Sequence, residues 1–306
     1  MEQSVDEQPV AVTSKPRSAL VAFLLSLLLP GLGQMYNGQP QKGAILFGLL
    51  LLIPLLLGIT RFITSYYGLL SLLIAGVALY IYAIVDGVKH AKRKQVFTPK
   101  LYNKWYSLLL IAIVILTLST LLEPVDILGV RSFVNQSNAC SPTMHEGDWL
   151  IADTWAYRSR EPDYGDIVVF SRPDGVAFLF RVVGRPNDTI ELVDNVVKVN
   201  GRMSKTTLVK ETTDNGIQAL ELEEELPNGR VHLLRKLKVP HEHSYANTKS
   251  IVVPFDSYYV LGDNRDYAAD SRYNGTVRRD RITGQVMYSY WGKAGTARMN
   301  VTFTDK

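Results

Sequence analysis

Long apolar runs fill the first two fifths of the chain. Four such stretches precede residue 125, at residues 18–29, 43–59, 68–85 and 106–122. A helix that crosses a bilayer needs about 20 mostly apolar residues. The last three stretches approach that length without a single Asp, Glu, Lys or Arg, so they are predicted to be transmembrane helices. The first is broken at Pro30-Gly31, and we expect it either to kink across the bilayer or to dip in and return.

Beyond about residue 130 the pattern changes to short β-rich runs separated by turn signals. The turns include Arg172-Pro173-Asp174-Gly175 and Asn200-Gly201. Many short strands with this punctuation favour a mainly-β fold, barrel-like or sandwich-like. Residues 202–250 are charged and lack long apolar runs, and we interpret them as an insertion that caps the β core. The predicted strands are residues 167–171, 178–183, 189–192, 196–199, 257–261 and 285–290.

These patterns divide the chain into a tail (1–17), a multi-span membrane module (18–105), a transmembrane anchor (106–122) and a β domain (123–306). The loop at residues 87–105 is strongly basic. Because basic residues resist translocation, this loop is predicted to face the cytoplasm and the β domain to be extracytoplasmic. The amino-terminal topology, with three or four spans, stays open. The cations of the loop are Lys89, Lys92, Arg93, Lys94, Lys100 and Lys104.

Composition and charge limit the classes of partner and cofactor to be expected. The net charge of the 306 residues is +4, but the basic residues form no long stripe, so no nucleic-acid partner is expected. Cys140 is the one cysteine, which excludes an intramolecular disulfide. His241-Glu242-His243 could contact a metal, but two imidazoles on a loop are more often solvated, and we expect no metal or cofactor.

The break after the first apolar stretch has a specific pattern. The segment Pro30-Gly31-Leu32-Gly33-Gln34-Met35-Tyr36-Asn37-Gly38 resembles a turn of small bacterial two-helix membrane modules, over roughly residues 18–90. Glycine lets helices approach closely, and we interpret the segment as a packing device. The predicted spans lack ionisable residues, so transport chemistry is not indicated.

Four motifs in the β half resemble those of one enzyme family. They occupy residues 136–148, 164–170, 180–188 and 262–272. In order, they resemble Ser-x-Ser-Met-x-Pro-Thr-Leu, Gly-Asp-Ile-Val-Val-Phe, Lys-Arg-Val-Val-Gly-x-Pro-Gly-Asp and Gly-Asp-Asn-Arg-Asp-x-Ser-x-Asp-Ser-Arg of the type I signal peptidases, the S26 serine peptidases. The resemblance covers roughly residues 106–295. It implies a bacterial protein of the cytoplasmic (inner) membrane with a signal-peptidase-like extracytoplasmic domain, and the apolar stretches predict that this protein is multi-pass.

The resemblance also implies a serine nucleophile and a neutral lysine that takes its proton. This chain departs from that pattern at the nucleophile (Ala139), the lysine (Phe180) and the lysine-orienting serine (Ala268). Ser137 retains the auxiliary hydroxyl that would help to stabilise the oxyanion. A methyl group cannot attack a carbonyl, and Arg181 cannot replace the base because its guanidinium stays protonated. The catalytic dyad is therefore predicted to be degenerate.

The other motif residues are expected to shape the site without reacting. Gly147-Asp148 and Gly262-Asp263 are most simply turns, and the charged side chains of the last motif are expected to form ion pairs. This scaffold set is Pro142, Thr143, Gly147, Asp148, Arg181, Gly262, Asp263, Asn264, Arg265, Asp270 and Arg272.

Cys140 is a weak alternative nucleophile, with His145 nearby in sequence. The resembling motif has a packing methionine at that position, and a buried cysteine behaves as a small hydrophobe. If the segment is extended, Cys140 and Ala139 point to opposite faces. Ser137 and Ser141 lack a lysine placed to activate them.

Three functional interpretations remain. The chain is a non-catalytic signal peptidase homologue that binds exported precursor proteins or a partner peptidase, an active signal peptidase with unusual site residues, or a structural membrane scaffold. The first fits the degenerate dyad best. Membrane lipid is an expected partner in all three.

Overall fold

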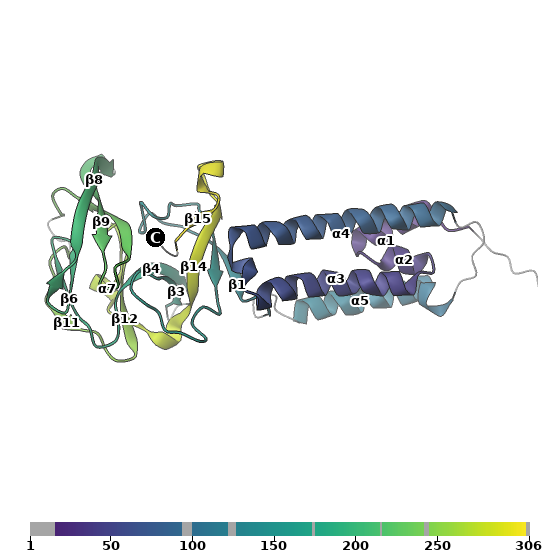
Figure 1. Cartoon of the computed structure of the whole chain (residues 1–306), viewed down its shortest axis with the longest axis horizontal. Helices are drawn as coiled ribbons and strands as arrows, with labels where there is room; N and C mark the ends of the chain where they lie inside the picture. The colour runs from purple at the N-terminus through teal and green to yellow at the C-terminus, as the bar shows by residue number, and fades with distance from the viewer. Residues whose placement is uncertain are drawn as a thin grey trace, which may run out of the picture. The chain divides into compact units, whose positions relative to one another are not determined.

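The computed structural model describes residues 16–93, 100–121, 127–172, 175–214, 216–241 and 245–303. They form two compact units divided between Leu128 and Gly129, with Thr64–Tyr66 grouped in the second. The first unit is helical and the second is mainly β (Figure 1). Nearly all of the predicted tail, parts of the predicted basic loop and the histidine pair's His243 lie outside the described residues.

Each predicted apolar stretch is confirmed as a helix, and the Pro-Gly break contains a further short helix. By length and composition, α3 and α4 could cross a membrane, whereas α1 and the Trp105–Leu118 part of α5 are shorter apolar helices. Figure 1 shows these helices running alongside one another within their unit. Their bounds are α1 (Ala19–Leu28), α2 (Leu32–Tyr36), α3 (Pro40–Ile59), α4 (Tyr66–Arg93) and α5 (Trp105–Leu121).

The basic loop was predicted to begin at residue 87, which is before the end of the preceding helix. Helix α4 continues to Arg93, so Lys89, His90 and Lys92 lie on its last turns rather than in a loop. Cations are favoured there because the carbonyl groups at a helix carboxyl end carry partial negative charge. The loop is thus shorter than the sequence indicated.

The Pro-Gly motif packs helices against one another. A Cβ on Gly31 would lie 2.6 Å from the Gly43 carbonyl oxygen, and Gly31 adopts a φ of +106° that favours glycine. The Gln34 Nε2 donates to the Ala83 carbonyl at 2.7 Å, and the Asn37 Nδ2 donates to the Gly87 carbonyl at 2.7 Å. Both amides therefore tie α2 to α4, which accounts for this motif by packing.

The second unit is built on one large sheet with the order β1-β2-β14-β3-β4-β12-β13, to which β15 adds by pairing with β14. All six predicted strands are confirmed, as β3, β4, β5, β6, β12 and β14. The large sheet contains β1 (Val130–Val134), β2 (Trp149–Asp153), β3 (Ile167–Ser171), β4 (Ala177–Gly184), β12 (Ser257–Leu261), β13 (Val277–Arg278), β14 (Ile282–Trp291) and β15 (Val301–Thr302).

A smaller sheet has the order β11-β5-β6-β7, and a short helix, α7 (Ser271–Asn274), follows β12. The strands of that sheet are β5 (Thr189–Val193), β6 (Val196–Val199), β7 (Arg202–Met203) and β11 (Ile251–Val252). Val182 of β4 belongs to one buried cluster and Val183 to another. Adjacent strand residues point to opposite faces, so β4 is buried on both. It therefore carries Phe180 and Arg181 into two different environments.

The predicted cap, residues 202–250, contains a three-stranded antiparallel sheet that the sequence did not reveal. Its order is β10-β9-β8, with β8 (Lys205–Asp214), β9 (Ile217–Glu225) and β10 (Val231–Leu237). Strand β8 is exposed along most of its length on both faces, so it shows no apolar alternation. The sheet is joined to the last motif, because the Leu237 N–H donates to the Asp266 carboxylate at 2.8 Å.

Candidate active site

The loop between β1 and β2 carries the nucleophile position. It forms a turn, in which the Ser141 N–H donates to the Asn138 carbonyl at 3.0 Å and the Met144 N–H donates to the Cys140 carbonyl at 2.9 Å. This segment is therefore not extended, in contrast to the conformation considered from the sequence. Strand geometry therefore does not place Cys140 and Ala139 on opposite faces, and the environment of Cys140 is set by its own contacts.

Ala139, Phe180 and Ala268 meet around Gly262. A Cβ built on Gly262 would lie 2.3 Å from the Ala268 Cβ, 2.5 Å from the Ala139 carbonyl oxygen and 3.3 Å from a ring carbon of Phe180. The fold thus brings together three positions that are 41 and 88 residues apart along the chain. Glycine is required at 262 by this close approach rather than by a positive φ.

The lysine position is an apolar slot. Phe180 is 4% exposed and belongs to a buried cluster that also contains Cys140 and Ala268. Its ring centroid lies 6.0 Å from that of Phe170 and 6.3 Å from that of Phe178, within the range of favourable aromatic pairs. The phenyl ring therefore fills this slot with apolar contacts and offers no group that can take a proton.

On the other face of β4, Arg181 forms a buried bidentate ion pair with Asp263. The Nε donates to Oδ1 at 2.8 Å, the Nη2 to Oδ2 at 2.7 Å, and the Nη1 to the Gly165 carbonyl at 2.8 Å. Burial disfavours the charged carboxylate, but the Arg181 guanidinium more than offsets this and holds the pKa of Asp263 below its usual value. This pair fixes the third motif to the fourth.

His232, on β10, extends this charged cluster and was missed by sequence reasoning. Its Nε2 lies 3.4 Å from the Glu224 Oε2 and 3.8 Å from the Asp263 Oδ1. Burial, helped by the nearby Arg181 guanidinium, lowers the pKa of His232 to about 4. The imidazole is neutral at pH 7. No motif could have found it, because it lies in the insertion and meets its partners only through the fold.

Arg265 and Arg272 are held by separate carboxylates. The Arg265 Nη2 lies 2.5 Å from the Glu224 Oε2, and both side chains are fully buried. The Arg272 Nε and Nη2 donate to the two Asp270 oxygens at 2.9 and 2.8 Å. Asp270 also accepts the Gly262 N–H at 3.0 Å. The last motif is thus fastened to the Gly262 position by its own ion pair.

Asn264 connects that motif to the nucleophile loop. Its N–H donates to the Ala139 carbonyl at 3.0 Å, and its Nδ2 donates to the Asn138 carbonyl at 3.2 Å. These bonds hold the loop backbone whatever side chain is present at 139.

Asp148 and Gly147 hold the other end of the loop. The Asp148 carboxylate accepts the His145 N–H at 2.8 Å and pairs with Arg298 at 2.5 Å. Arg298 also donates to the Thr143 carbonyl at 3.1 Å. Gly147 has a φ of +86°, which fits the predicted turn. Asp148 does more than form a turn, because its buried carboxylate forms an ion pair with Arg298, which follows β14.

Pro142 and Thr143 line a pocket of about 360 Å³ together with Arg181, His232 and the tail residue Phe303. Thr143 accepts the Arg181 Nη2 at 3.4 Å and donates to the Leu233 carbonyl at 3.4 Å. The nucleophile loop, the insertion and the segment after β14 therefore all line this one pocket.

The remaining candidate nucleophiles are poorly placed. Cys140 is buried and its Sγ donates to the Leu179 carbonyl at 3.0 Å. Burial raises the pKa of this thiol far above its usual range, which suppresses the reactive thiolate. The Ser137 Oγ accepts the Ala139 N–H at 3.4 Å, and the Ser141 Oγ donates to the Met144 carbonyl at 3.3 Å.

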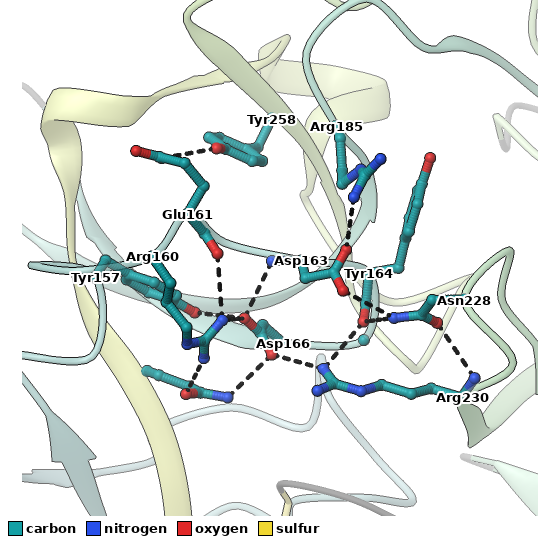
Figure 2. Close-up of polar contacts among 12 residues, drawn as sticks. Tyr157, Arg160, Glu161, Asp163, Tyr164, Asp166, Arg185, Asn228, Arg230 and Tyr258 are labelled. Atoms are coloured by element: carbon teal, nitrogen blue, oxygen red, sulfur yellow. Dashed lines mark hydrogen bonds and ion pairs between the residues drawn. The ribbon is translucent and has the colours of Figure 1, made fainter.

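A second, polar cleft of about 790 Å³ is lined by charged residues to which the sequence analysis gave no role, among them Arg230, which also lines the pocket of about 360 Å³. Figure 2 shows Asp166, from the second motif, where several donors meet. Its carboxylate accepts from Arg160 and Arg230 at 2.8 Å each and from the Tyr157 hydroxyl at 3.1 Å. Arg185 pairs with Asp163 at 3.1 Å. These arginines are bonded to carboxylates, which fits a structural network.

Comparison with known proteins agrees with the motifs. Signal peptidase I of Rickettsia akari (strain Hartford) is 32% identical over 177 residues, covering 49% of this chain and 66% of that protein. The Rickettsia typhi (strain Wilmington) enzyme is 30% identical over 195 residues, covering 55% and 74%. The chain thus spans just under two thirds of the first relative's length.

A solved signal peptidase I from Enterococcus faecalis V583 shares 26% identity and covers 41% of this chain and 97% of that one, with a TM-score of 0.26, too low to support a statement about fold. The family model described as "Signal peptidase, peptidase S26" matches residues 102–291, more than half of the chain. The chain therefore belongs to the S26 signal peptidase family.

Proposed function

We propose that this chain is a membrane-anchored signal peptidase homologue that holds exported precursor peptides, or a partner peptidase, without cleaving them. The observation that carries the proposal is the meeting of Ala139, Phe180 and Ala268 around Gly262. Covalent peptide hydrolysis needs a nucleophile with an adjacent base. Neither the methyl groups nor the phenyl ring at these positions can serve.

Peptide binding does not need the dyad. Strand β1 is the terminal strand in the order of the large sheet, and the chain runs from Val134 into the loop that carries Ala139. An edge strand presents N–H and C=O groups with which an extended peptide can pair. Main-chain pairing of this kind supports binding of a precursor segment beside a site that does not react.

The apolar helices support membrane anchoring. Helices α3 and α4 each have a mean hydropathy of 2.3 in their most apolar windows. The basic residues near the end of α4 favour a cytoplasmic location for that end. We place the chain in the bacterial inner membrane, multi-pass, with the β unit outside the cytoplasm.

The test uses the full-length chain in detergent with a fluorogenic signal-peptide substrate. The unmodified chain is expected to bind this peptide without turnover, and the triple variant Ala139→Ser/Phe180→Lys/Ala268→Ser is expected to gain measurable cleavage. Ala139→Ser/Phe180→Met/Ala268→Ser is the matched control, because it restores the hydroxyls without a base. Turnover by the unmodified chain that disappears in Cys140→Ala would replace this proposal with a cysteine nucleophile.

A further inference from the structure

The helical unit contains an apolar groove of about 680 Å³ between α1, α2 and the start of α5. This volume falls within the range of about 300–1,000 Å³ that is usual for small-molecule sites. Its floor is buried, with Leu32, Leu108 and Ala112 each at most 5% exposed. Leu28 and Leu109 form exposed walls, at 56% and 51%. A groove with a packed floor and open apolar walls suits a hydrocarbon chain.

Two cations, Arg17 and Lys104, line the same groove, and among its lining residues in the described chain none is acidic. The Arg17 guanidinium lies 4.2 Å from the centroid of the Tyr36 ring, whose hydroxyl accepts the Ser18 N–H at 3.2 Å. Lys104 lies 5.8 Å from the centroid of the Tyr106 ring and directly precedes α5. These contacts bring cationic groups and aromatic rings to a groove that is otherwise apolar.

Among the described residues of the helical unit, the net charge has the same sign. Residues 16–93 and 100–121 contain one acidic residue, Asp86, which pairs with Lys42 at 2.7 Å. A net positive groove favours a ligand with a negative head over a neutral one. The Lys and Arg residues of these segments are Arg17, Lys42, Arg61, Lys89, Lys92, Arg93, Lys100 and Lys104.

We propose that this groove is a binding site for one anionic glycerophospholipid. Its phosphate is held by Arg17 and Lys104, and an acyl chain lies along Leu28, Leu109 and Ala112. Basic pockets between membrane helices bind anionic headgroups, and aromatic residues favour the headgroup level. The site rests on the proposed membrane location of the helical unit, but it is independent of the proposed loss of catalysis.

The test measures lipid retained by the detergent-purified full-length chain in native mass spectrometry, after titration with phosphatidylglycerol or phosphatidylcholine. The unmodified chain is expected to prefer phosphatidylglycerol. Arg17→Gln/Lys104→Gln is expected to weaken that binding about 25-fold, at roughly fivefold for each cation removed near a membrane surface.

Lys92→Gln/Arg93→Gln is the matched control, because it removes the same charge from exposed residues of α4 that do not line the groove. It is expected to change phosphatidylglycerol binding less than twofold. Equal losses in both variants, or equal binding of the two lipids by the unmodified chain, would overturn the site in favour of general attraction.

Alkaline carbonate extraction of membranes separates this proposal from the proposed function. A chain that is released by carbonate overturns the membrane location and the lipid site together. A chain that stays in the membrane but shows no phosphatidylglycerol preference overturns the lipid site alone. Peptide cleavage by the unmodified chain would overturn only the loss of catalysis.

Discussion

The Arg181–Asp263 pair is the most heavily buried ion pair linking two of the family motifs. Both side chains are at most 5% exposed, and every nitrogen of the guanidinium donates to a partner within the unit. In an apolar environment, charges are tolerated only when they are paired and hydrogen-bonded. We infer that this pair holds the site region together, although the neighbouring residue at 180 carries no catalytic group.

Breaking this pair should be costly. Arg181→Met leaves a buried, unpaired Asp263, which is expected to lower the free energy of unfolding by about 3–5 kcal/mol. Thermal and denaturant unfolding of the full-length chain in detergent, followed by near-ultraviolet circular dichroism, measures the loss. The double variant Arg181→Met/Asp263→Leu should recover part of it. A single-variant loss below about 1 kcal/mol would show that the carboxylate finds another partner.

His232 makes the stability of the β unit depend on pH. Its pKa is about 4 in the folded chain, against an ordinary value of 6.5. The unfolded chain therefore binds a proton between these values while the folded chain does not, so the stability contributed by neutral His232 is complete above about pH 6.5 and declines as the pH falls toward 4. The loss amounts to about 3 kcal/mol.

Unfolding measured from pH 7 to pH 4 tests this dependence. His232→Gln should flatten the curve in this window. His145, whose pKa is also lowered by burial, contributes with the same sign, so His145→Gln is the companion variant. Loss of stability below about pH 4 comes from paired carboxylates such as Asp263 and should remain in both variants. An unchanged slope in His232→Gln would contradict the assignment.

At the scale of elements, the tail after β14 fastens the nucleophile loop. The family match ends at residue 291, and β15 follows it, paired with β14 through Ser289↔Val301. Between these two strands, Arg298 reaches back to Asp148 and to the Thr143 carbonyl. This segment therefore adds a support that the family motifs do not contain.

Arg298→Ala is expected to destabilise the β unit by about 3 kcal/mol, because the buried Asp148 carboxylate loses its charged partner. The measurement is the unfolding midpoint of the full-length chain. Lys293→Ala is the matched control, since the Lys293–Glu146 pair is exposed and worth at most about 1 kcal/mol. Equal effects of the two changes would rule out a special role for Arg298.

At the scale of the whole molecule, the two units have their own buried clusters. The β unit contains two, one around Val168 and Val182 and one around Val183 and Leu261. The helical unit is packed around Leu29, Leu32, Leu108 and Ala112. A unit with its own core can fold independently.

Residues 129–306 expressed without the helical unit are therefore expected to be folded and to unfold cooperatively. Circular dichroism on heating checks this, with the Arg181→Met variant of the same fragment as the destabilised reference. A fragment without a cooperative transition would mean that the β unit depends on the helices.

The sequence by itself determined those features of this protein that follow from local patterns of residues. Four apolar stretches predicted helices and six β-rich runs predicted strands, because side-chain periodicity reflects one-sided or complete burial. Four ordered motifs indicated the family, and single residue identities at 139, 180 and 268 indicated the altered dyad. Strand β8 of the insertion was not predicted because it is exposed on both faces and therefore carries no apolar alternation, and in β9 and β10 several buried positions are occupied by charged or polar residues such as Glu224 and His232.

The tertiary structure alone decided which distant residues meet. Asp148 and Arg298 are 150 positions apart, and His232 joins Glu224 and Asp263 through an insertion without a motif. The crowding that demands glycine at 262 also depends on backbone atoms from another loop. Such contacts are set by how strands and loops pack in three dimensions, and a partner's identity leaves no periodic trace in the sequence of either segment.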